Sequence, residues 1–285
     1  MSAHRKPKKK EGGTKSRNKA QGFYVYCIGL RVHLEPLFEA GLPSSIESDA
    51  MLEIAAHDDL AAVVSAVPLA DYGEDALEAR LHDPTWTALR AMRHEKVVEH
   101  FARRASVVPL RFGTIYLERA SIEQMLAERR AELGRLIERL KGREEWGLNI
   151  YCDQAKLLEA IASMSPALRE LSARAELASP GQSYLMRKKI DALRADEARA
   201  ATRRVINEIE RELSNRSQSV VRLRVLKDEG SSHGELVAKS AFLVERARFE
   251  EFRAAAEQLA EKHASAGFQL ELTGPWPAYN FAVAQ

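Results

Sequence analysis

The order of periodic segments in the second half of the chain is the feature that most constrains the fold. From residue 146 onward, four short runs have the alternation or the apolar composition of strands. Two longer stretches repeat apolar residues every three or four positions, as a helix packed on one side does. The order is strand, helix, strand, strand, helix, strand, which predicts a ferredoxin-like βαββαβ domain. The runs that carry this pattern are 148–152, 180–213, 221–225, 236–244, 249–259 and 268–272.

The first half of the chain predicts a separate unit of mixed α and β structure. Runs at 22–28, 51–55 and 60–67 have the length and composition of strands, and the last two are separated by a polar turn. Asp83 followed by Pro84 predicts a helix start, because aspartate caps the first amides and proline fits the first turn. Apolar residues at helical spacing, among them Leu89 and Met92, carry this helix to about Arg104. An extended segment then follows at 107–113.

Two further helix starts fit the capping box, in which a serine hydroxyl and a glutamine side chain each satisfy a free backbone amide. Ser121 with Gln124 predicts one helix whose apolar stripe ends at Leu140. Ser179 with Gln182, joined by proline at the first helical position, predicts the start of the long charged helix that ends near residue 213.

These segments predict an α+β protein with two domains, since 285 residues exceed the roughly 100–150 of one common domain. We expect a disordered basic tail at 1–20, an N-terminal α+β domain at 21–117, a ferredoxin-like C-terminal domain at 118–274 and a C-terminal extension at 275–285. Residues 1–20 contain eight bases and one acid, so they carry +7 and leave about −5 on the rest of a chain whose net charge is +2. The tail is a candidate to hold nucleic acid or an acidic partner, and the alternative is a solubilising extension.

The sequence contains no recognisable catalytic apparatus. His94 and His100 are six positions apart on the predicted helix, so they cannot share a metal as histidines four apart do, and we expect them on a charged surface. The nucleophile-elbow, dinucleotide and phosphate-loop patterns are missing, and the glycine-rich turn around His233 leads into a strand. We therefore predict that the chain is not an enzyme and has no catalytic residues, metal, cofactor or small-molecule substrate.

Composition predicts a cytoplasmic protein with a sizeable core. Hydrophobic residues make up 45% of the chain, yet no run approaches the roughly 18–20 apolar residues of a membrane span, and we expect no membrane contact. Cys27 and Cys152 are far apart and lack a C-x-x-C pattern, so we expect buried free thiols, with a disulfide left open. The strand at 221–225 lacks the aromatic residues of an RNA-recognition module, which argues against nucleic acid as a partner.

Two segments provide candidate partner-binding residues. Arg111 lies beside Phe112 among apolar neighbours, where a guanidinium needs an ion pair or carbonyl groups, so the alternatives are a structural ion pair and partner recognition. After the last predicted strand, two prolines bar a regular ladder, so the aromatic residues there dock on their own domain or on a partner. The aromatic candidates are Trp276, Tyr279 and Phe281.

Five segments in sequence order resemble landmarks of the gas vesicle protein GvpF/GvpL family. They are YVYCI at 24–28, HEKVV at 94–98, VPLRFGT at 108–114, GQSYL at 181–185 with the following Lys188 and Lys189, and LTGPWPAYNF at 272–281. The resemblance covers nearly the whole chain from Gly22 onward and leaves the basic tail outside. It implies a two-domain α+β protein whose C-terminal extension lies along a ferredoxin-like domain, and it brings no catalytic residues.

The same resemblance implies a non-enzymatic accessory or minor structural role in gas vesicle assembly, through contacts with the shell protein GvpA and other accessory Gvp proteins. We hypothesise that exposed strand edges and apolar patches engage the hydrophobic shell subunit before it polymerises, because an unpaired strand edge is a template for another chain. The competing hypothesis is a nucleic-acid or acidic-partner binding protein that acts through the basic tail.

Overall fold

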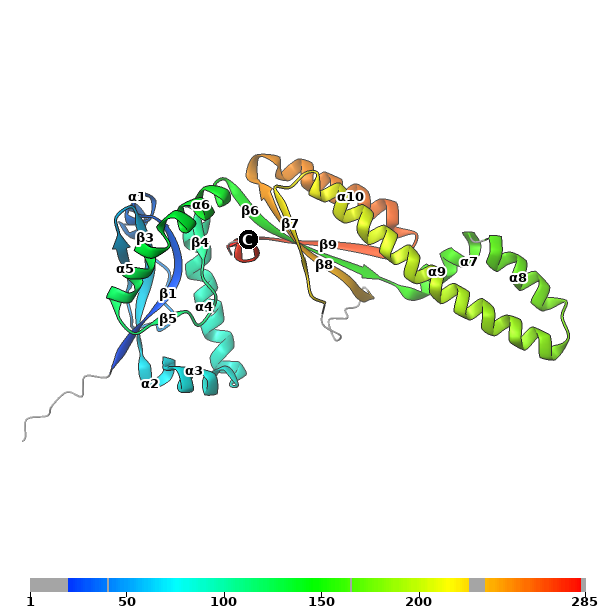
Figure 1. Cartoon of the computed structure of the whole chain (residues 1–285), viewed down its shortest axis with the longest axis horizontal. Coiled ribbons are helices and arrows are strands. Elements are labelled where there is room, and N and C mark those ends of the chain that lie inside the picture. The colour runs from blue at the N-terminus through cyan, green and yellow to red at the C-terminus, as the bar shows by residue number, and fades with distance from the viewer. Residues whose placement is uncertain (1–19, 40, 165, 226–233, 283–285) are drawn as a thin grey trace, which may run out of the picture.

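Two antiparallel sheets, one in each half of the chain, form the framework of this α+β protein (Figure 1). The computed structural model describes residues 20–39, 41–164, 166–225 and 234–282. Residues 1–19 of the predicted basic tail and the predicted hairpin turn with His233 lie outside these ranges. Among the helices described, none is long and apolar enough to cross a membrane.

The first sheet has the strand order β2-β3-β1-β4, and β5 also pairs with β1. The predicted hairpin is confirmed, because β2 and β3 pair in antiparallel register with Asp58 in the left-handed region at φ 50° between them. Strand β1 is central and buried on both faces, which explains its almost unbroken apolar run. The strands are β1 (Gln21–Leu30), β2 (Leu52–His57), β3 (Leu60–Pro68), β4 (Val107–Pro109) and β5 (Ile115–Tyr116).

Helices cover both faces of the first sheet. Helix α4 (Pro84–Ala102) packs on one face, and α5 (Arg119–Glu128) with α6 (Arg130–Leu140) packs on the other. The predicted start of α4 is confirmed, because the Asp83 carboxylate accepts the amides of Thr85 and Trp86 at 3.0 and 3.1 Å. Four shorter helices complete the unit: α1 (Arg31–Leu34), η1 (Glu35–Glu39), α2 (Leu69–Tyr72) and α3 (Glu74–Leu81).

The buried stripe of α4 differs from the prediction in its middle turns. Leu89 and Met92, expected to pack inward, are 40% and 50% exposed. His94, expected on a charged surface, is 3% exposed. The predicted Trp86, Val97 and Phe101 are buried, and His94 and Val98 complete the buried stripe in place of Leu89 and Met92.

Both predicted capping boxes are wrong. Helix α5 begins at Arg119, so Ser121 lies inside its first turn, and the side-chain amide of Gln124 donates to the carboxylate of Glu128 at 2.8 Å. The predicted single helix also breaks at Arg129, whose φ and ψ of −100° and 13° separate α5 from α6. The guanidinium of Arg119 donates to the carbonyl of Ile54 in β2, so a tertiary contact fixes this helix start. The long helix does begin at Pro180, but the Ser179 side chain makes no capping bond.

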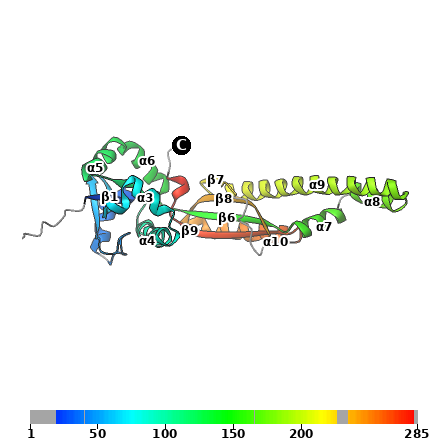
Figure 2. The ribbon, with the colours of Figure 1, turned by 90° about the horizontal axis from the view of Figure 1, so that it is seen from below.

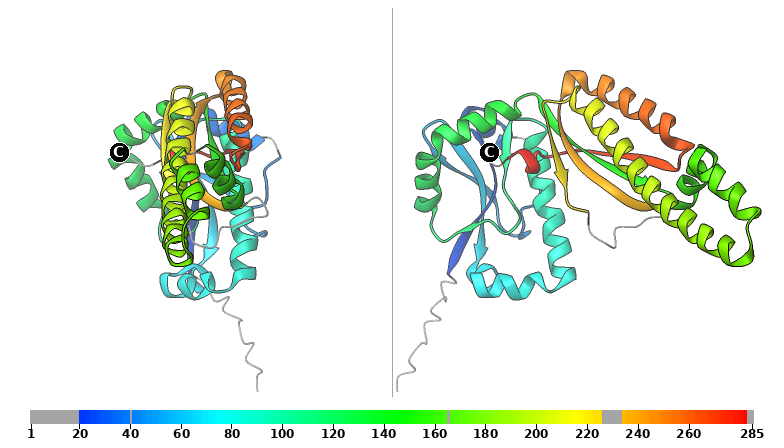
Figure 3. Two further views of the ribbon diagram at one scale, coloured as in Figure 1. Left: turned by 90° about the vertical axis from the view of Figure 1, so that its right-hand side faces the viewer. Right: turned by 45° about the vertical axis from the view of Figure 1, so that its right-hand side comes forward.

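The second sheet has the order β7-β8-β6-β9, and every neighbouring pair is antiparallel. Its strands are β6 (Arg143–Cys152), β7 (Ser219–Leu223), β8 (Glu235–Glu245) and β9 (Phe268–Trp276). Helices α9 (Pro180–Ser214) and α10 (Phe249–Ala264) lie against the same face and close one core with β6 and β8 (Figure 3). The short helix η2 (Arg246–Arg248) leads from β8 into α10.

The N-terminal part of α9 projects beyond the sheet together with α7 (Gln154–Met164) and α8 (Pro166–Glu176) (Figure 2). Helices α8 and α9 form a helical hairpin with a small core of its own around Leu168, Ala175 and Ile190. The tip of this hairpin is at the end of the molecule remote from the first sheet (Figure 1).

The last strand continues further than its prolines predict. Strand β9 includes Pro275 and ends at Trp276, which pairs with Glu145 after a register shift in the ladder with β6. The irregular register accommodates a residue without an amide proton, as proline at an edge strand requires. The short helix η3 (Tyr279–Phe281) then places the end of the described chain at the junction of the two halves (Figure 1).

Candidate functional site

The junction between the two halves brings together most of the residues singled out in the sequence. The segment after β9 leaves the second sheet and packs on the N-terminal half. Phe281 is 2% exposed in the core between the first sheet and α5 and α6, and Tyr279 packs against the opposite core beside α4. The extension therefore docks within its own chain, but on the N-terminal half rather than along the C-terminal domain.

A buried chain of polar groups holds Tyr279 at this junction. The hydroxyl of Tyr24 lies 2.9 Å from Nδ1 of His94, and Nε2 of His94 lies 3.1 Å from the hydroxyl of Tyr279. The Tyr279 hydroxyl donates to Oε2 of Glu95 at 3.0 Å, while the amide of Gly113 donates to Tyr24 at 3.0 Å. These partners fit a neutral imidazole with its proton on Nε2.

Burial sets the charge of this polar chain. It lowers the pKa of His94 from 6.5 to about 4, which keeps the imidazole neutral at pH 7. Burial also raises the pKa of Tyr279, with the neighbouring Glu95 carboxylate acting in the same direction, and raises the pKa of Glu95 itself. His94 is 3% exposed, and its network joins β1, α4 and the C-terminal segment at the junction.

Glu145, in strand β6 of the second sheet, forms hydrogen bonds with the same C-terminal segment. Its carboxylate accepts the backbone amide of Asn280 at 2.9 Å and the side-chain amide of Asn280 at 2.5 Å. Glu145 is 5% exposed, and burial raises its pKa while the two amide bonds oppose that shift. One carboxylate thus ties strand β6 to the helix that lies on the other half.

The two candidate residues in the loop at 110–114 lie in different environments. Phe112 is partly buried and meets the rings of Tyr24 and His94 edge-on at centroid distances of 6.2 and 5.8 Å. Arg111 is exposed and makes no ion pair with any residue in the described ranges. The expectation that Arg111 needs a desolvated partner is wrong, because the turn directs its side chain to water.

Trp276 is the most exposed of the aromatic candidates. Its side chain is 48% exposed, and the indole N–H donates to the hydroxyl of Thr273 at 3.3 Å. Partner binding by Arg111, Phe112, Trp276, Tyr279 and Phe281 stays a prediction, and exposure favours it for Arg111 and Trp276. No sequence pattern pointed to Glu145, whereas the spacing of His94 from Trp86 and Phe101 already fitted one helix face.

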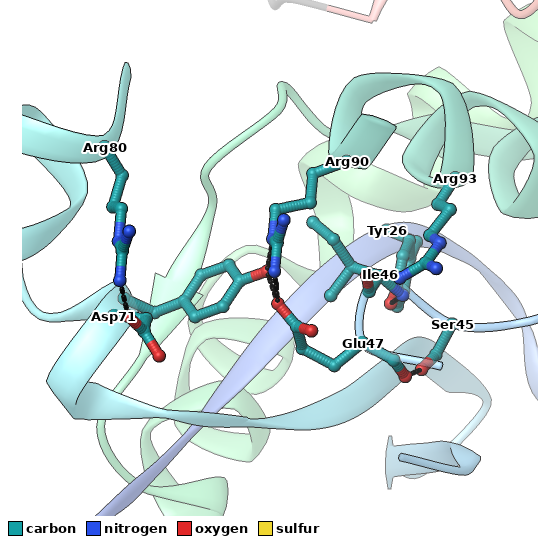
Figure 4. Close-up of polar contacts among 9 residues, drawn as sticks. Tyr26, Ser45, Ile46, Glu47, Asp71, Arg80, Arg90 and Arg93 are labelled. Carbon is teal, nitrogen blue, oxygen red and sulfur yellow. Dashed lines mark hydrogen bonds and ion pairs between the residues drawn. The ribbon is translucent and has the colours of Figure 1, made fainter. Parts of the chain in front are cut away.

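A second polar network supports α4 from the other side. The guanidinium of Arg90 and the hydroxyl of Tyr72 both contact the carboxylate of Glu47, at 2.8 and 2.6 Å (Figure 4). Arg90 also lies 4.2 Å from the centre of the Trp86 ring. Next to it, the hydroxyl of Tyr26 accepts the amide of Ile46 at 2.8 Å. These contacts hold the loop before β2 against α4, the helix that carries His94.

The tip of the α8–α9 hairpin is the clearest exposed apolar surface. Leu177, Tyr184 and Leu185 are 91%, 58% and 67% exposed, and they lie within one short stretch around the turn. Large apolar side chains gathered on a projecting element are typical of interaction surfaces. We call these three residues the hairpin tip.

Comparison with known proteins gives a consistent result. The family model "Gas vesicle synthesis protein GvpL/GvpF" matches residues 22–283. Gas vesicle protein L of a Streptomyces species is 32% identical over 231 residues, which are 79% of this chain and 81% of that protein. Gas vesicle protein L1 of Halobacterium salinarum is 26% identical and aligns with 99% of this chain and 98% of its own length. The crystal structure of GvpF from Anabaena has the same fold, with a TM-score of 0.67 at 18% identity over 93% of this chain and 97% of that one.

Proposed function

The chain belongs to the GvpL/GvpF family of gas vesicle synthesis proteins, and we propose that it acts in gas vesicle synthesis as a non-enzymatic binding protein. Its proposed partners are the shell protein GvpA and other accessory Gvp proteins, and its proposed place of action is the cytoplasm and the gas vesicle. The residues with strongly shifted pKa values at the junction are enclosed and hydrogen-bonded to one another, which supports a structural rather than a catalytic use.

We further propose that the C-terminal half is a ferredoxin-like domain with a helical hairpin inserted before its second strand. The antiparallel order β7-β8-β6-β9 supports this, and so does the placement of α9 and α10 on one face. The inserted hairpin would then be the part free to specialise for binding.

The hairpin tip is the observation that carries the proposed function. Its three large apolar side chains are exposed on a projecting helical hairpin. Exposure of apolar side chains to water is unfavourable, and the fold does not require it at this position. A hydrophobic shell subunit is a partner of matching chemistry, because burying these side chains against it removes apolar area from water.

Strand β9 supports the proposal in a second way. It is nine residues long, forms one edge of the second sheet, and among the described strands pairs with β6 alone. By contrast, the β2 edge of the first sheet is occupied by Arg119 of α5, and the opposite edge strand β7 has only five residues. Such an edge can accept a strand from another chain, most readily ahead of Pro275.

Co-purification with GvpA tests this proposal. Leu177→Asp and Leu185→Asp should each abolish most of the GvpA retained by the tagged chain, because a carboxylate in an apolar interface must be desolvated. Leu185 is 67% exposed in the second turn of α9, so Leu185→Asp places no charge in the protein interior. The matched control is Val32→Asp in α1, which alters a side chain that is 70% exposed but far from the tip.

We expect the Val32→Asp protein to retain GvpA and to support vesicle formation. The proposal is wrong if both tip variants retain GvpA as well as the control does. It is also wrong if cells without this chain form normal vesicles.

A further inference from the structure

A pocket of about 150 Å³ lies between the two halves of the chain. Four parts of the chain far apart in sequence form it: the end of α4, the start of β6, Arg246, and the segment around Trp276. The junction described above fixes these parts relative to one another, so the pocket is preformed.

Arginine dominates the lining of this pocket. Arg103, Arg104, Arg143 and Arg246 line it, against two carboxylates, Glu99 and Glu144. Those carboxylates are already engaged, Glu99 by Arg103 and Glu144 by Arg246 at 3.0 Å. The other two guanidinium groups, those of Arg104 and Arg143, therefore have no carboxylate partner in the pocket lining and are in excess there.

The two excess guanidinium groups are incompletely satisfied. Arg104 donates to the carbonyl of His100 at 2.8 Å and makes no ion pair with any residue in the ranges described. Arg143 donates to the carbonyl of Arg139 at 2.6 Å and has a weak pair with Glu245 at 3.4 Å, while its Nε is buried without a hydrogen-bond partner among those residues. Unpaired guanidinium donors beside a pocket favour a carboxylate, which they bind with charge-assisted hydrogen bonds.

Trp276 adds an aromatic anchor at the rim. Half of its side chain is exposed, and it is held in place by the bond to Thr273 and by the pairing of its backbone with β6. Tryptophan and arginine together are the residues that most often dominate the binding energy of protein interfaces. Pro275 and Pro277 on either side keep the surrounding backbone stiff.

We infer that this pocket binds an acidic peptide segment of a partner protein, with one carboxylate side chain inserted between Arg104 and Arg143 and the methylene groups of an adjacent side chain packed against Trp276. The volume fits one side chain and is well below the roughly 300–1,000 Å³ of small-molecule sites. The two lining carboxylates would repel the successive phosphates of a nucleic acid, which an acidic peptide with spaced charges avoids. The inference rests on the proposed role as a binding protein and names the class of partner for a second surface.

The test uses the full chain and a fluorescein-labelled hexaglutamate peptide, with anisotropy as the readout at physiological ionic strength. Wild type should bind the peptide saturably, and unlabelled hexaglutamine should not compete. Arg104→Gln should weaken binding about fivefold, and Trp276→Ala about tenfold. Circular dichroism of each variant checks that the fold is retained.

Two controls separate the pocket from general charge. Arg174→Gln removes the same charge from α8, where the side chain is 65% exposed and remote from the pocket. A second control replaces Lys8, Lys9 and Lys10 with glutamine and lowers the charge of the basic N-terminal segment. Both should change the affinity less than Arg104→Gln does.

The inference is overturned if either control weakens binding as much as Arg104→Gln, or if hexaglutamate does not bind. It is also overturned if an oligothymidylate displaces the peptide at equal or lower concentration, which would assign the pocket to nucleic acid. None of these results affects retention of GvpA by the hairpin tip, so failure here is distinct from failure of the proposed function.

Discussion

Replacing His94 with glutamine should remove much of the loss of stability that this protein suffers in mild acid. The imidazole is 3% exposed, and burial lowers its pKa to about 4, while the unfolded chain has the ordinary value near 6.5. The folded state therefore binds the proton less tightly than the unfolded state. The stabilisation is complete above about pH 6.5 and is lost as the pH falls from 6.5 towards 4.

The size of the effect follows from the width of this window. Each pH unit inside it costs about 1.4 kcal/mol, so wild type should lose about 2 kcal/mol between pH 7 and pH 5 through His94 alone. Glu95 and Glu145 act in the opposite direction, because burial raises their pKa values and their protonation favours the folded state as the pH falls. Both carboxyl groups are present in wild type and variant, so the difference between the two proteins isolates His94.

Urea unfolding of wild type and His94→Gln at pH 7 and pH 5 measures this difference. Glutamine still offers a donor and an acceptor to Tyr24 and Tyr279 but does not titrate. The gap in unfolding free energy between the two proteins should shift by about 2 kcal/mol in favour of the variant at pH 5. The exposed His82, changed to glutamine, is the control and should behave as wild type. An equal pH dependence in wild type and His94→Gln would refute the reasoning.

Three further predictions concern packing, capping and thiol access. Phe281→Ala should cost about 3–5 kcal/mol of unfolding free energy, since the ring is 2% exposed, and a cost below that of Trp276→Ala would contradict its placement. Asp83→Ala should cost about 1 kcal/mol by removing the cap of α4, and unchanged stability in the same urea assay would count against that cap. Burial raises the pKa of Cys27 and of Cys152, so neither thiol should react with Ellman's reagent in the native protein; both should react in urea, and native labelling would disprove their burial.

The junction explains why the C-terminal segment matters to both halves. Tyr279 and Phe281 enter the two cores on opposite faces of the first sheet, while Asn280 between them bonds to Glu145 of the second sheet. Three successive residues therefore connect both cores of the first sheet to the second sheet. A truncation before Tyr279 should loosen the relative position of the halves and the pocket between them, not only remove a surface.

Local signals determined the elements that depend on near neighbours in the chain. The alternation at Leu148, Ile150 and Cys152, the β2–β3 hairpin and the Asp83 cap were all predicted and are all present. Each depends on the strand or helix period or on hydrogen bonds within a few residues, so the necessary information lies in one short stretch. The burial of both cysteines followed from the same apolar runs.

Only the tertiary structure decided which face of a helix is buried and what meets at the junction. Leu89 is more apolar than His94, yet His94 is inside because Tyr24, Tyr279 and Phe112 surround it with partners from distant parts of the chain. Glu145 and Asn280 are 135 residues apart, and no local period relates them. The burial of a polar side chain depends on whether distant groups can satisfy it, and that condition exists only once the layers are packed.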